Sequence, residues 1–483
     1  MKNLLILFLA VASLPVFAQV NASSGSASAP FKLTAQNPEF NSYSTSDGNY
    51  FVVRWTELFE NIYNLVATDK AGAVISSKEI TLPMSMSNNT FGINELLVIG
   101  QKPYAFVENR NKSTMKNTLT ARPVDNKGTV APQGAAIASF PIVKMSNSGD
   151  WYVSLTPDKK HVAVLWKPAY QKGTADIFTY ILLDENLKEI SKRQFSFSGY
   201  TKEITPASFY SSDKGDAFIT MEEFDKLYKY PIVYAAPATG NPLIMPAMIS
   251  DPTLKSLSYI TKINSQGELV IAGYTQQKKN LVIGDTQATG TWIFNSSTPA
   301  QIKTAKFDKP ITNLTALDIV YNKNMFFLVG EQMLPEKQKN EYTSGPKALE
   351  TNFIYQHNDI LVSGFNQDGS KKFEMPISRK WQSKLNFDSD LKIATGVINN
   401  KLTLIYNDSY SKYINEHNMA NVRLPVAVQI TSDGLMEAPV HFGKELDTKV
   451  SSYVLYPQFF TQGNNNISIL SVNPQSVKEV VFQ

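Results

Sequence analysis

Cysteine is absent from all 483 residues of the sequence. Its absence excludes disulfide bonds, cysteine nucleophiles, cysteine-ligated zinc and iron–sulfur clusters. A chain of this length can bury enough apolar surface to be stabilised by its core alone. We therefore expect a large fold that does without covalent cross-links.

Charge and catalytic motifs are also scarce. Charged residues make up 18% of the chain and the net charge is only +4, so nucleic acid is not expected as the main partner. The chain has four histidines, and none forms an HxH or HExxH motif. There is no GxSxG elbow and no phosphate-binding glycine loop. The sequence therefore predicts no catalytic residue, no metal site and no cofactor.

The N-terminus has the pattern of an export signal. A short basic start, Met1–Asn3, precedes the apolar stretch Leu4–Val16, and small residues lie at the −3 and −1 positions before Gln19. We expect cleavage after Ala18. No later stretch reaches about eighteen apolar residues, so no membrane span is expected in the mature chain, although peripheral association with a membrane is compatible with it. The predicted location is periplasmic, outer-membrane-associated or extracellular.

A turn-and-strand motif recurs along the chain about once every fifty residues. In Ser44–Trp55 and Leu155–Trp166 a polar turn leads into an apolar strand. In Leu65–Val74 and Val362–Lys371 an apolar strand enters an Asp/Asn turn and a second strand leaves it. Such turn residues are typical of β-hairpins. Short strands at this regular spacing indicate a radial or stacked β architecture.

The motif divides the chain into repeats of four antiparallel strands. A remaining piece, Tyr453–Phe482, holds three strands, and Phe31–Ala35 would supply the fourth and so close the ring without exposed edges. The prediction is an all-β fold: a single closed β-propeller with eight blades. Seven blades come next, and a sandwich or two separate all-β domains is the other alternative. The seven full repeats span about Phe40–Pro83, Asn89–Ile142, Trp151–Phe197, Pro206–Ile249, Leu257–Phe307, Leu314–Ile377 and Leu391–Phe442.

These repeats resemble those of secreted β-propellers in general, over nearly the whole mature length. The WD dipeptide, kelch glycine pairs, YVTN repeats and the NHL pattern are all missing. The resemblance therefore implies a fold and carries over no functional residue. The expected domain organisation is a signal peptide over residues 1–18, a flexible leader over 19–30 and the propeller over 31–483.

Long loops on one face are the best candidates for function. In a propeller the turns between strands A and B and between C and D share one face, and the B–C and D–A connections share the other. The two longest B–C segments, Gln332–Asn358 and Asp408–Arg423, belong to consecutive repeats and are expected to be neighbours. The segment Gln332–Tyr355 is expected to be a solvated loop. The predicted binding residues are Tyr342, Lys347, Tyr355, His357, Tyr410, Tyr413, His417 and Arg423.

Two functions fit this pattern. The first is an exported, non-enzymatic binding or scaffolding propeller of a bacterial cell envelope, which binds an envelope protein complex or a glycan through aromatic and basic loops. The alternative is a carbohydrate-active propeller enzyme, either a glycoside hydrolase or a lyase. Such an enzyme needs convergent carboxylates, and Glu222, Glu223 and Asp225 are candidates.

Overall fold

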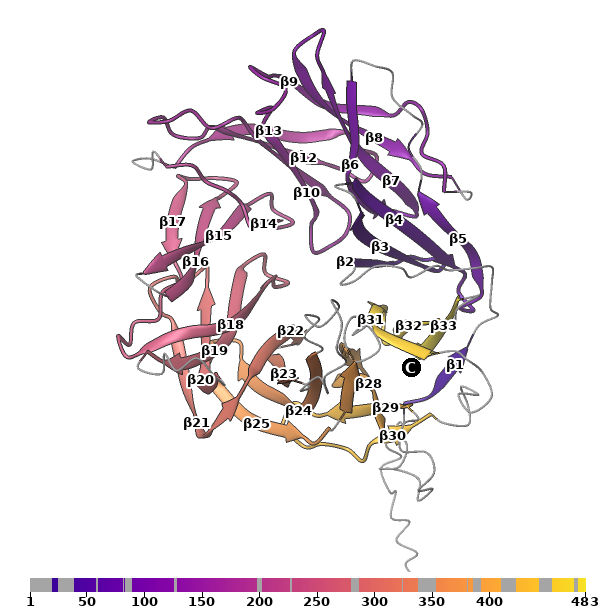
Figure 1. Ribbon diagram of the computed structural model, residues 1–483, viewed down its shortest axis with the longest axis vertical. Coiled ribbons are helices and arrows are strands. Elements are labelled where there is room, and N and C mark those ends of the chain that lie inside the picture. Colours follow the sequence, from indigo (N-terminus) through magenta and orange to yellow (C-terminus); the bar gives the residue numbers. More distant parts are fainter. Residues whose placement is uncertain are drawn as a thin grey trace, which may run out of the picture.

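The chain forms a closed ring of eight antiparallel β-sheets, a β-propeller (Figure 1). The computed structural model describes residues 20–24, 39–57, 60–80, 82, 89–125, 128–197, 202–225, 228–278, 286–323, 325–337, 353–379, 381–384, 392–409, 423–442, 454–472 and 477–483. These residues contain no helix. In this part of the chain, accordingly, no helical segment long and apolar enough to cross a membrane is found. The prediction of an all-β propeller with eight blades is confirmed.

Blades 1 to 4 follow one another along the chain, and the first strand of each lies innermost. Blade 1 contains β2 (Glu39–Ser44), β3 (Asn49–Glu57), β4 (Glu60–Thr68) and β5 (Val74–Ile80). Blade 2 contains β6 (Asn89–Ile99), β7 (Lys102–Asn111), β8 (Lys116–Pro123) and β9 (Ala135–Pro141). Blade 3 contains β10 (Asp150–Leu155), β11 (Val162–Lys167), β12 (Phe178–Leu183) and β13 (Glu189–Phe195). Blade 4 contains β14 (Ser208–Ser211), β15 (Ala217–Asp225), β16 (Tyr228–Ala236) and β17 (Leu243–Pro246).

Blades 5 to 7 continue the same order, and blade 6 has one additional strand. Blade 5 contains β18 (Leu254–Ile263), β19 (Leu269–Gln277), β20 (Gln287–Asn295) and β21 (Lys303–Thr312). Blade 6 contains β22 (Leu314–Asn322), β23 (Met325–Lys337), β24 (Phe353–Asn366), β25 (Lys371–Ile377) and the additional β26 (Trp381–Lys384). Blade 7 contains β27 (Ala394–Ile398), β28 (Lys401–Ser409), β29 (Arg423–Ile430) and β30 (Val440–His441).

Blade 8 joins the two ends of the chain. Its inner three strands are β31 (Val454–Gln462), β32 (Ile467–Val472) and β33 (Val477–Phe482), and the outermost is β1 (Ala22–Ser24). The amide of Asn21 donates to the carbonyl of Gln483 at 2.9 Å, and the reverse bond measures 3.0 Å. Closure by an N-terminal strand is therefore confirmed.

The strand that closes the ring is not the one expected from the sequence. It lies within the segment assigned to a flexible leader, whereas Phe31–Ala35 lie outside the described residues. The physical reason is that this outermost strand is short and mostly polar (Ala22-Ser23-Ser24). It is held by backbone hydrogen bonds to β33, which leave no signature in local hydrophobicity.

The hydrophobic core lies between blades. The middle strands β11 and β12 of blade 3 are buried along their whole length, while the outer β13 alternates between partly buried and exposed residues. One apolar cluster joins blade 3 to blade 4 and another joins blade 6 to blade 7. Because each sheet buries both faces against its neighbours, its middle strands are continuous apolar runs.

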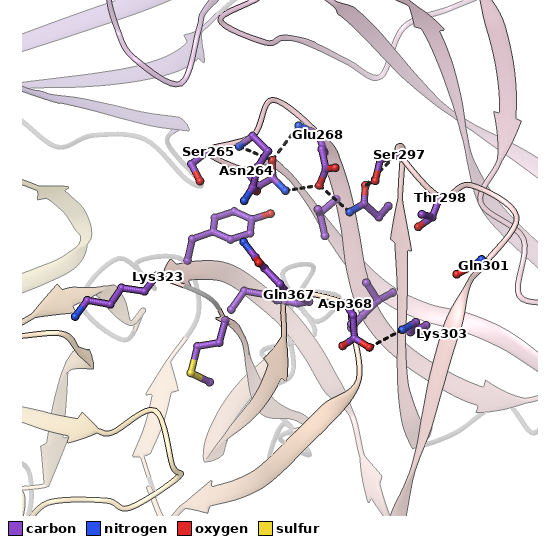
Figure 2. Close-up of a pocket in the computed structure, with 18 residues that line it drawn as sticks. Asn264, Ser265, Glu268, Ser297, Thr298, Gln301, Lys303, Lys323, Gln367 and Asp368 are labelled. Carbon is purple, nitrogen blue, oxygen red and sulfur yellow. Dashed lines mark hydrogen bonds and ion pairs between the residues drawn. The ribbon is translucent and has the colours of Figure 1, made fainter.

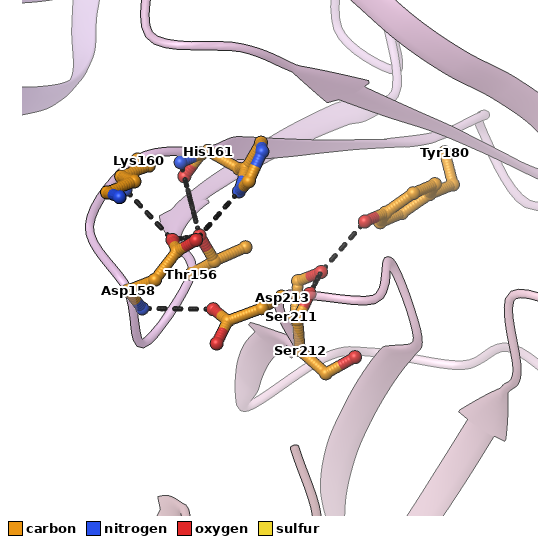
Figure 3. A network of polar contacts seen from close by, with 8 residues as sticks. All are labelled: Thr156, Asp158, Lys160, His161, Tyr180, Ser211, Ser212 and Asp213. Carbon is orange, nitrogen blue, oxygen red and sulfur yellow. Dashed lines mark hydrogen bonds and ion pairs between the residues drawn. The ribbon is translucent and has the colours of Figure 1, made fainter. Parts of the chain in front are cut away.

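Polar contacts also connect neighbouring blades. Figure 3 shows the A–B turn of blade 3, where the backbone amide of Asp158 donates to the Asp213 carboxylate of blade 4 at 2.9 Å. Deeper in the same interface, the hydroxyls of Tyr180 and Ser211 are 2.8 Å apart and buried. His161 lies in the turn just before β11, with Nδ1 3.0 Å from Asp158 Oδ2.

Candidate functional site

The antiparallel order of each blade places the B–C and D–A connections at one end of the sheets, which we call the B–C face. Two of the predicted binding residues, Tyr355 and His357, lie on β24, and Arg423 is the first residue of β29. Tyr342, Lys347, Tyr410, Tyr413 and His417 lie outside the described residues.

The B–C hairpin of blade 6 continues beyond its own blade. Strands β23 and β24 contain 13 and 14 residues, and they remain paired from Met333↔His357 to Lys337↔Phe353. On the other side of β24, the additional strand β26 pairs from His357↔Trp381 to Ile354↔Lys384. We call this three-stranded extension, residues 333–337, 353–357 and 381–384, the blade 6 arm.

The arm corrects the expectation that Gln332–Tyr355 is a solvated loop, because both ends of this segment are strands. The lack of strand signals in this segment is what suggested a loop. The Met333 amide donates to the Asn313 carbonyl at 3.0 Å, away from β24. Strand alternation places the nitrogen of Pro335 on the same outer side, where no ladder hydrogen bond is required. Proline is therefore compatible with the strand.

A buried ion pair fixes the base of the arm. Glu331 lies on β23 just before the arm, and Arg379 follows β25 in the D–A connection. Arg379 Nη1 donates to Glu331 Oε1 at 2.7 Å, with side chains 0% and 3% exposed. The guanidinium also lies 5.4 Å from the ring centre of Tyr406, on β28 of blade 7. One contact network therefore joins the arm, the D–A connection and the next blade.

Sequence reasoning missed this ion pair. The available signal was an acidic residue, Glu331, at the end of the apolar run Met325–Gly330 in a strand of the core. A charge at a buried position requires a partner. The sequence does not show which cationic residue is the partner of Glu331, because Arg379 is distant along the chain.

In blade 7, the predicted loop Asp408–Arg423 is shorter than expected at its start. Asp408 lies within β28, paired with Leu424, and is fully buried. The strand ends at Ser409, whose partner in the register is Arg423. The neighbouring Asn407 donates from Nδ2 to the carbonyl of Leu455 in blade 8 at 2.8 Å. The buried Asn407 thus connects this end of blade 7 to blade 8.

Of the three carboxylates considered for a glycosidase, the adjacent Glu222 and Glu223 do not converge, and Asp225 is the last residue of the same strand. Glu222 and Glu223 lie within β15, rather than after it, and consecutive residues of a strand point to opposite faces of the sheet. Glu222 Oε1 accepts a hydrogen bond from the Tyr259 hydroxyl of blade 5 at 2.9 Å. Burial and this carboxylate raise the pKa of Tyr259. Among the described residues, no group of three or more His, Asp or Glu could hold a metal ion.

Comparison with solved structures finds distant similarities. No protein-family profile and no curated protein matches the sequence. A member of the DUF4221 family from Bacteroides vulgatus is 10% identical with a TM-score of 0.31, covering 80% of this chain and 93% of that chain. A protein of unknown function from Bacteroides caccae is 8% identical with a TM-score of 0.26, covering 65% and 90%.

The third structure is a variant of the apocarotenoid oxygenase of Synechocystis. It is 8% identical with a TM-score of 0.35, covering 88% of this chain and 94% of that chain. Similarities this weak carry no argument about a site or an activity.

Proposed function

We propose that the protein is an exported, non-enzymatic binding propeller of a bacterial cell envelope that holds a protein partner on its B–C face at blades 6 and 7. The observation that carries this proposal is the blade 6 arm. The other blades close the ring with four strands each, so the arm is not needed for closure. A ribbon on a rigid ring is well placed to contact a partner.

The composition of the arm supports a protein interface. Tyr355 and His357 lie on its middle strand, and Trp381 is the register partner of His357. Aromatic side chains provide a large contact area at low cost in conformational entropy, and they are enriched in interface hot spots. The buried pair of Arg379 and Glu331 holds the base of the ribbon in place before any partner arrives. A preorganised surface loses less entropy on binding.

The edge of the arm suggests how the partner binds. Among the described strands, β26 pairs with β24 alone, so its other side presents backbone donors and acceptors. An extended segment of a partner can add to such an edge as a further strand. On the opposite edge, Pro335 provides no amide hydrogen and weakens any equivalent pairing. We therefore assign the partner to the β26 side.

Site-specific photocrosslinking in native envelopes tests this function. The photoreactive residue p-benzoylphenylalanine replaces Ser383 on β26, and the matched control places it at Ser191 on the outer strand β13 of blade 3. Mass spectrometry should identify a protein adduct at position 383 that is absent at position 191. The adduct should weaken when Trp381 is replaced by alanine. Equal labelling at both positions, or no adduct at 383, would contradict the proposal.

A further inference from the structure

A cavity of about 390 Å³ lies between blades 5 and 6, at the end of the sheets opposite the B–C face (Figure 2). Its walls come from four turns: the A–B and C–D turns of blade 5 and the corresponding turns of blade 6. Because the arm lies at the other end of blade 6, a ligand in this cavity is independent of the partner proposed above.

One wall of the cavity is a preformed hydrogen-bonding array. Glu268 Oε2 accepts from Asn264 Nδ2 at 2.8 Å and from Asn295 Nδ2 at 2.9 Å. Partial burial would raise the pKa of Glu268, but hydrogen bonds from Asn295, Asn264 and Ser297 outweigh it and leave this pKa below its usual value. The carboxylate is therefore ionised and held in one orientation, as a fixed acceptor for a ligand hydroxyl.

Tyr321 also lines the cavity, and its hydroxyl is buried. Among the described residues, the Tyr321 hydroxyl has no hydrogen-bond partner, although it is shielded from solvent. The aromatic ring of Tyr321 packs near that of Phe326, with the two ring centres 6.0 Å apart. Burial, together with Asp318 and Glu268, raises the pKa of Tyr321, so the hydroxyl keeps its proton and is able to donate. Buried polar groups are normally hydrogen-bonded, so this hydroxyl is an unsatisfied donor beside the cavity.

The described residues that line the cavity include as many cations as carboxylates. Lys303 and Asp368 form an ion pair at 3.1 Å. The other charged residues among the described lining residues are Lys323 and Glu268, again one cation and one carboxylate. An anionic ligand such as a phosphate would find no excess of positive charge.

Amides, hydroxyls and apolar residues make up the rest of the lining. The amides and hydroxyls offer both donors and acceptors, while the apolar residues offer a surface for C–H groups. The apolar residues are Val270, Ile293, Met325 and Phe326, and the further polar residues are Ser265, Gln266, Thr298, Gln301 and Gln367.

We propose that this cavity binds a neutral sugar. Sugars combine hydroxyl groups, which both donate and accept, with apolar C–H faces, and the wall offers a counterpart to each. Glu268 would accept from a sugar hydroxyl, and Tyr321 would turn its hydroxyl out of the wall and donate to a sugar oxygen. At about 390 Å³ the cavity is near the lower end of ligand pockets, which suits about one or two sugar units.

Titration of the full mature protein tests the proposal. Glucose, galactose, mannose, N-acetylglucosamine and cellobiose are each followed by saturation-transfer NMR and calorimetry. At least one should bind saturably, and Tyr321→Phe should raise its Kd about tenfold, the effect of one lost hydrogen bond. Because the hydroxyl has no partner in the unliganded protein, the same variant should melt at the same temperature as the wild type or higher.

The matched control is Tyr50→Phe, which removes a hydroxyl at the same end of the sheets but in blade 1, where it donates to the Gln101 carbonyl at 3.2 Å. Its sugar affinity should be unchanged. Gln301→Ala, at an exposed position of the lining, provides a second variant that does not disturb the core and should also weaken binding. A soluble polysaccharide built from the bound sugar is then added as a competitor. Competition indicates that the cavity accepts the end of a glycan chain, and lack of competition indicates that it accepts the free sugar.

Three results would overturn the proposal. The first is that no sugar of the panel binds saturably to the wild type at millimolar concentration. The second is unchanged affinity in both Tyr321→Phe and Gln301→Ala. The third is a lower melting temperature for Tyr321→Phe, which would show that the hydroxyl serves the fold instead.

Discussion

Arg379 and Glu331 form a fully buried ion pair at the junction of blades 6 and 7, with Nη1 and Oε1 2.7 Å apart. Asp359 lies beside it, with Oδ1 3.4 Å from the backbone amide of Arg379. Glu331 comes from strand β23 and Arg379 from the D–A connection, which the topology brings to the same end of blade 6, and the pair lies directly beneath the blade 6 arm. Its geometry decides how firmly the arm is joined to the ring.

Removing one partner of this pair should destabilise the protein strongly. Arg379→Ala leaves the Glu331 carboxylate buried without its ion-pair partner, which should lower the free energy of unfolding by about 3–5 kcal/mol. The control is Lys372→Ala, because Lys372 pairs with Asp433 across the same two blades but the side chains are 39% and 75% exposed. The Lys372→Ala substitution should lower the free energy of unfolding by less than about 1 kcal/mol. Urea denaturation measures both, and similar losses would contradict the prediction.

Closure of the ring should depend on β1. Deleting residues 19–24 removes the partner of Val480–Phe482 and exposes the edge of β33. The truncated protein should melt at a lower temperature or aggregate, because an unpaired strand edge pairs readily with other chains. Thermal melting and light scattering test this. A truncated protein that melts like the full mature chain would show that β1 contributes nothing to closure.

Stability at acidic pH should depend on Asp158. Partial burial raises the pKa of this carboxyl, but hydrogen bonds from Thr156, the Lys160 amide and His161 outweigh it, so the folded-state pKa lies below the ordinary 3.8. The unfolded chain therefore binds this proton more tightly. The stabilisation is fully present above about pH 4 and is lost as the pH falls through the lower folded-state value.

Asp158→Asn removes this titration. The difference in unfolding free energy between the variant and the wild type should shrink as the pH is lowered from about 5 to about 2. Urea denaturation at a series of pH values provides the measurement. A difference that stays constant over this range would show that Asp158 has the same pKa in the folded and unfolded chains.

Three of the predicted binding residues, the tyrosines of the two longest B–C segments, should contribute to affinity for the partner. Alanine at Tyr342, Tyr410 and Tyr413 together should weaken binding of the crosslinked partner by a few kcal/mol in sum, about the contribution of several interface aromatics. Melting temperatures should change little, because the sequence predicts these tyrosines in solvated loops, whose side chains add little to a core. Asp69→Ala, in the C–D turn of blade 1, is the control and should bind normally. Loss of binding in the control alone would place the interface on the opposite face.

Export should remove the first eighteen residues, at the site expected from Val16 and Ala18. Intact-mass measurement of the exported protein should give a chain that begins at Gln19, with or without cyclisation to pyroglutamate. A mature protein that retains Leu4–Val16 would indicate a membrane anchor instead.

The strands themselves could be predicted because they depend on neighbours in sequence. In Leu155–Trp166 the Asp/Lys turn and the apolar run after it fix a hairpin, and the structure has β10 and β11 at that place. Similar turn-and-strand segments recur along the chain, and together with an N-terminal closing strand they gave the correct number of blades. Where local chemistry was ambiguous, as at Pro335, the prediction of a loop was wrong.

The candidate site was only partly accessible to such reasoning. That Tyr355 and His357 belong to the B–C face follows from counting strands, and the structure places both on β24 at that end of blade 6. Their pairing with β26 depends on a segment more than twenty residues further along the chain, and no local pattern specifies it.

The sequence by itself determined that this protein is a ring of repeated four-stranded sheets, because turn residues and strand periodicity act over a few neighbouring residues. The tertiary structure alone decided the contacts between distant segments: Ala22 with Phe482, Arg379 with Glu331, and Glu268 and Tyr321 around one cavity. Each of these contacts depends on where ring closure places two strands in space. Hydrogen bonds and ion pairs select partners by distance and direction, and neither is encoded in the spacing of residues along the chain.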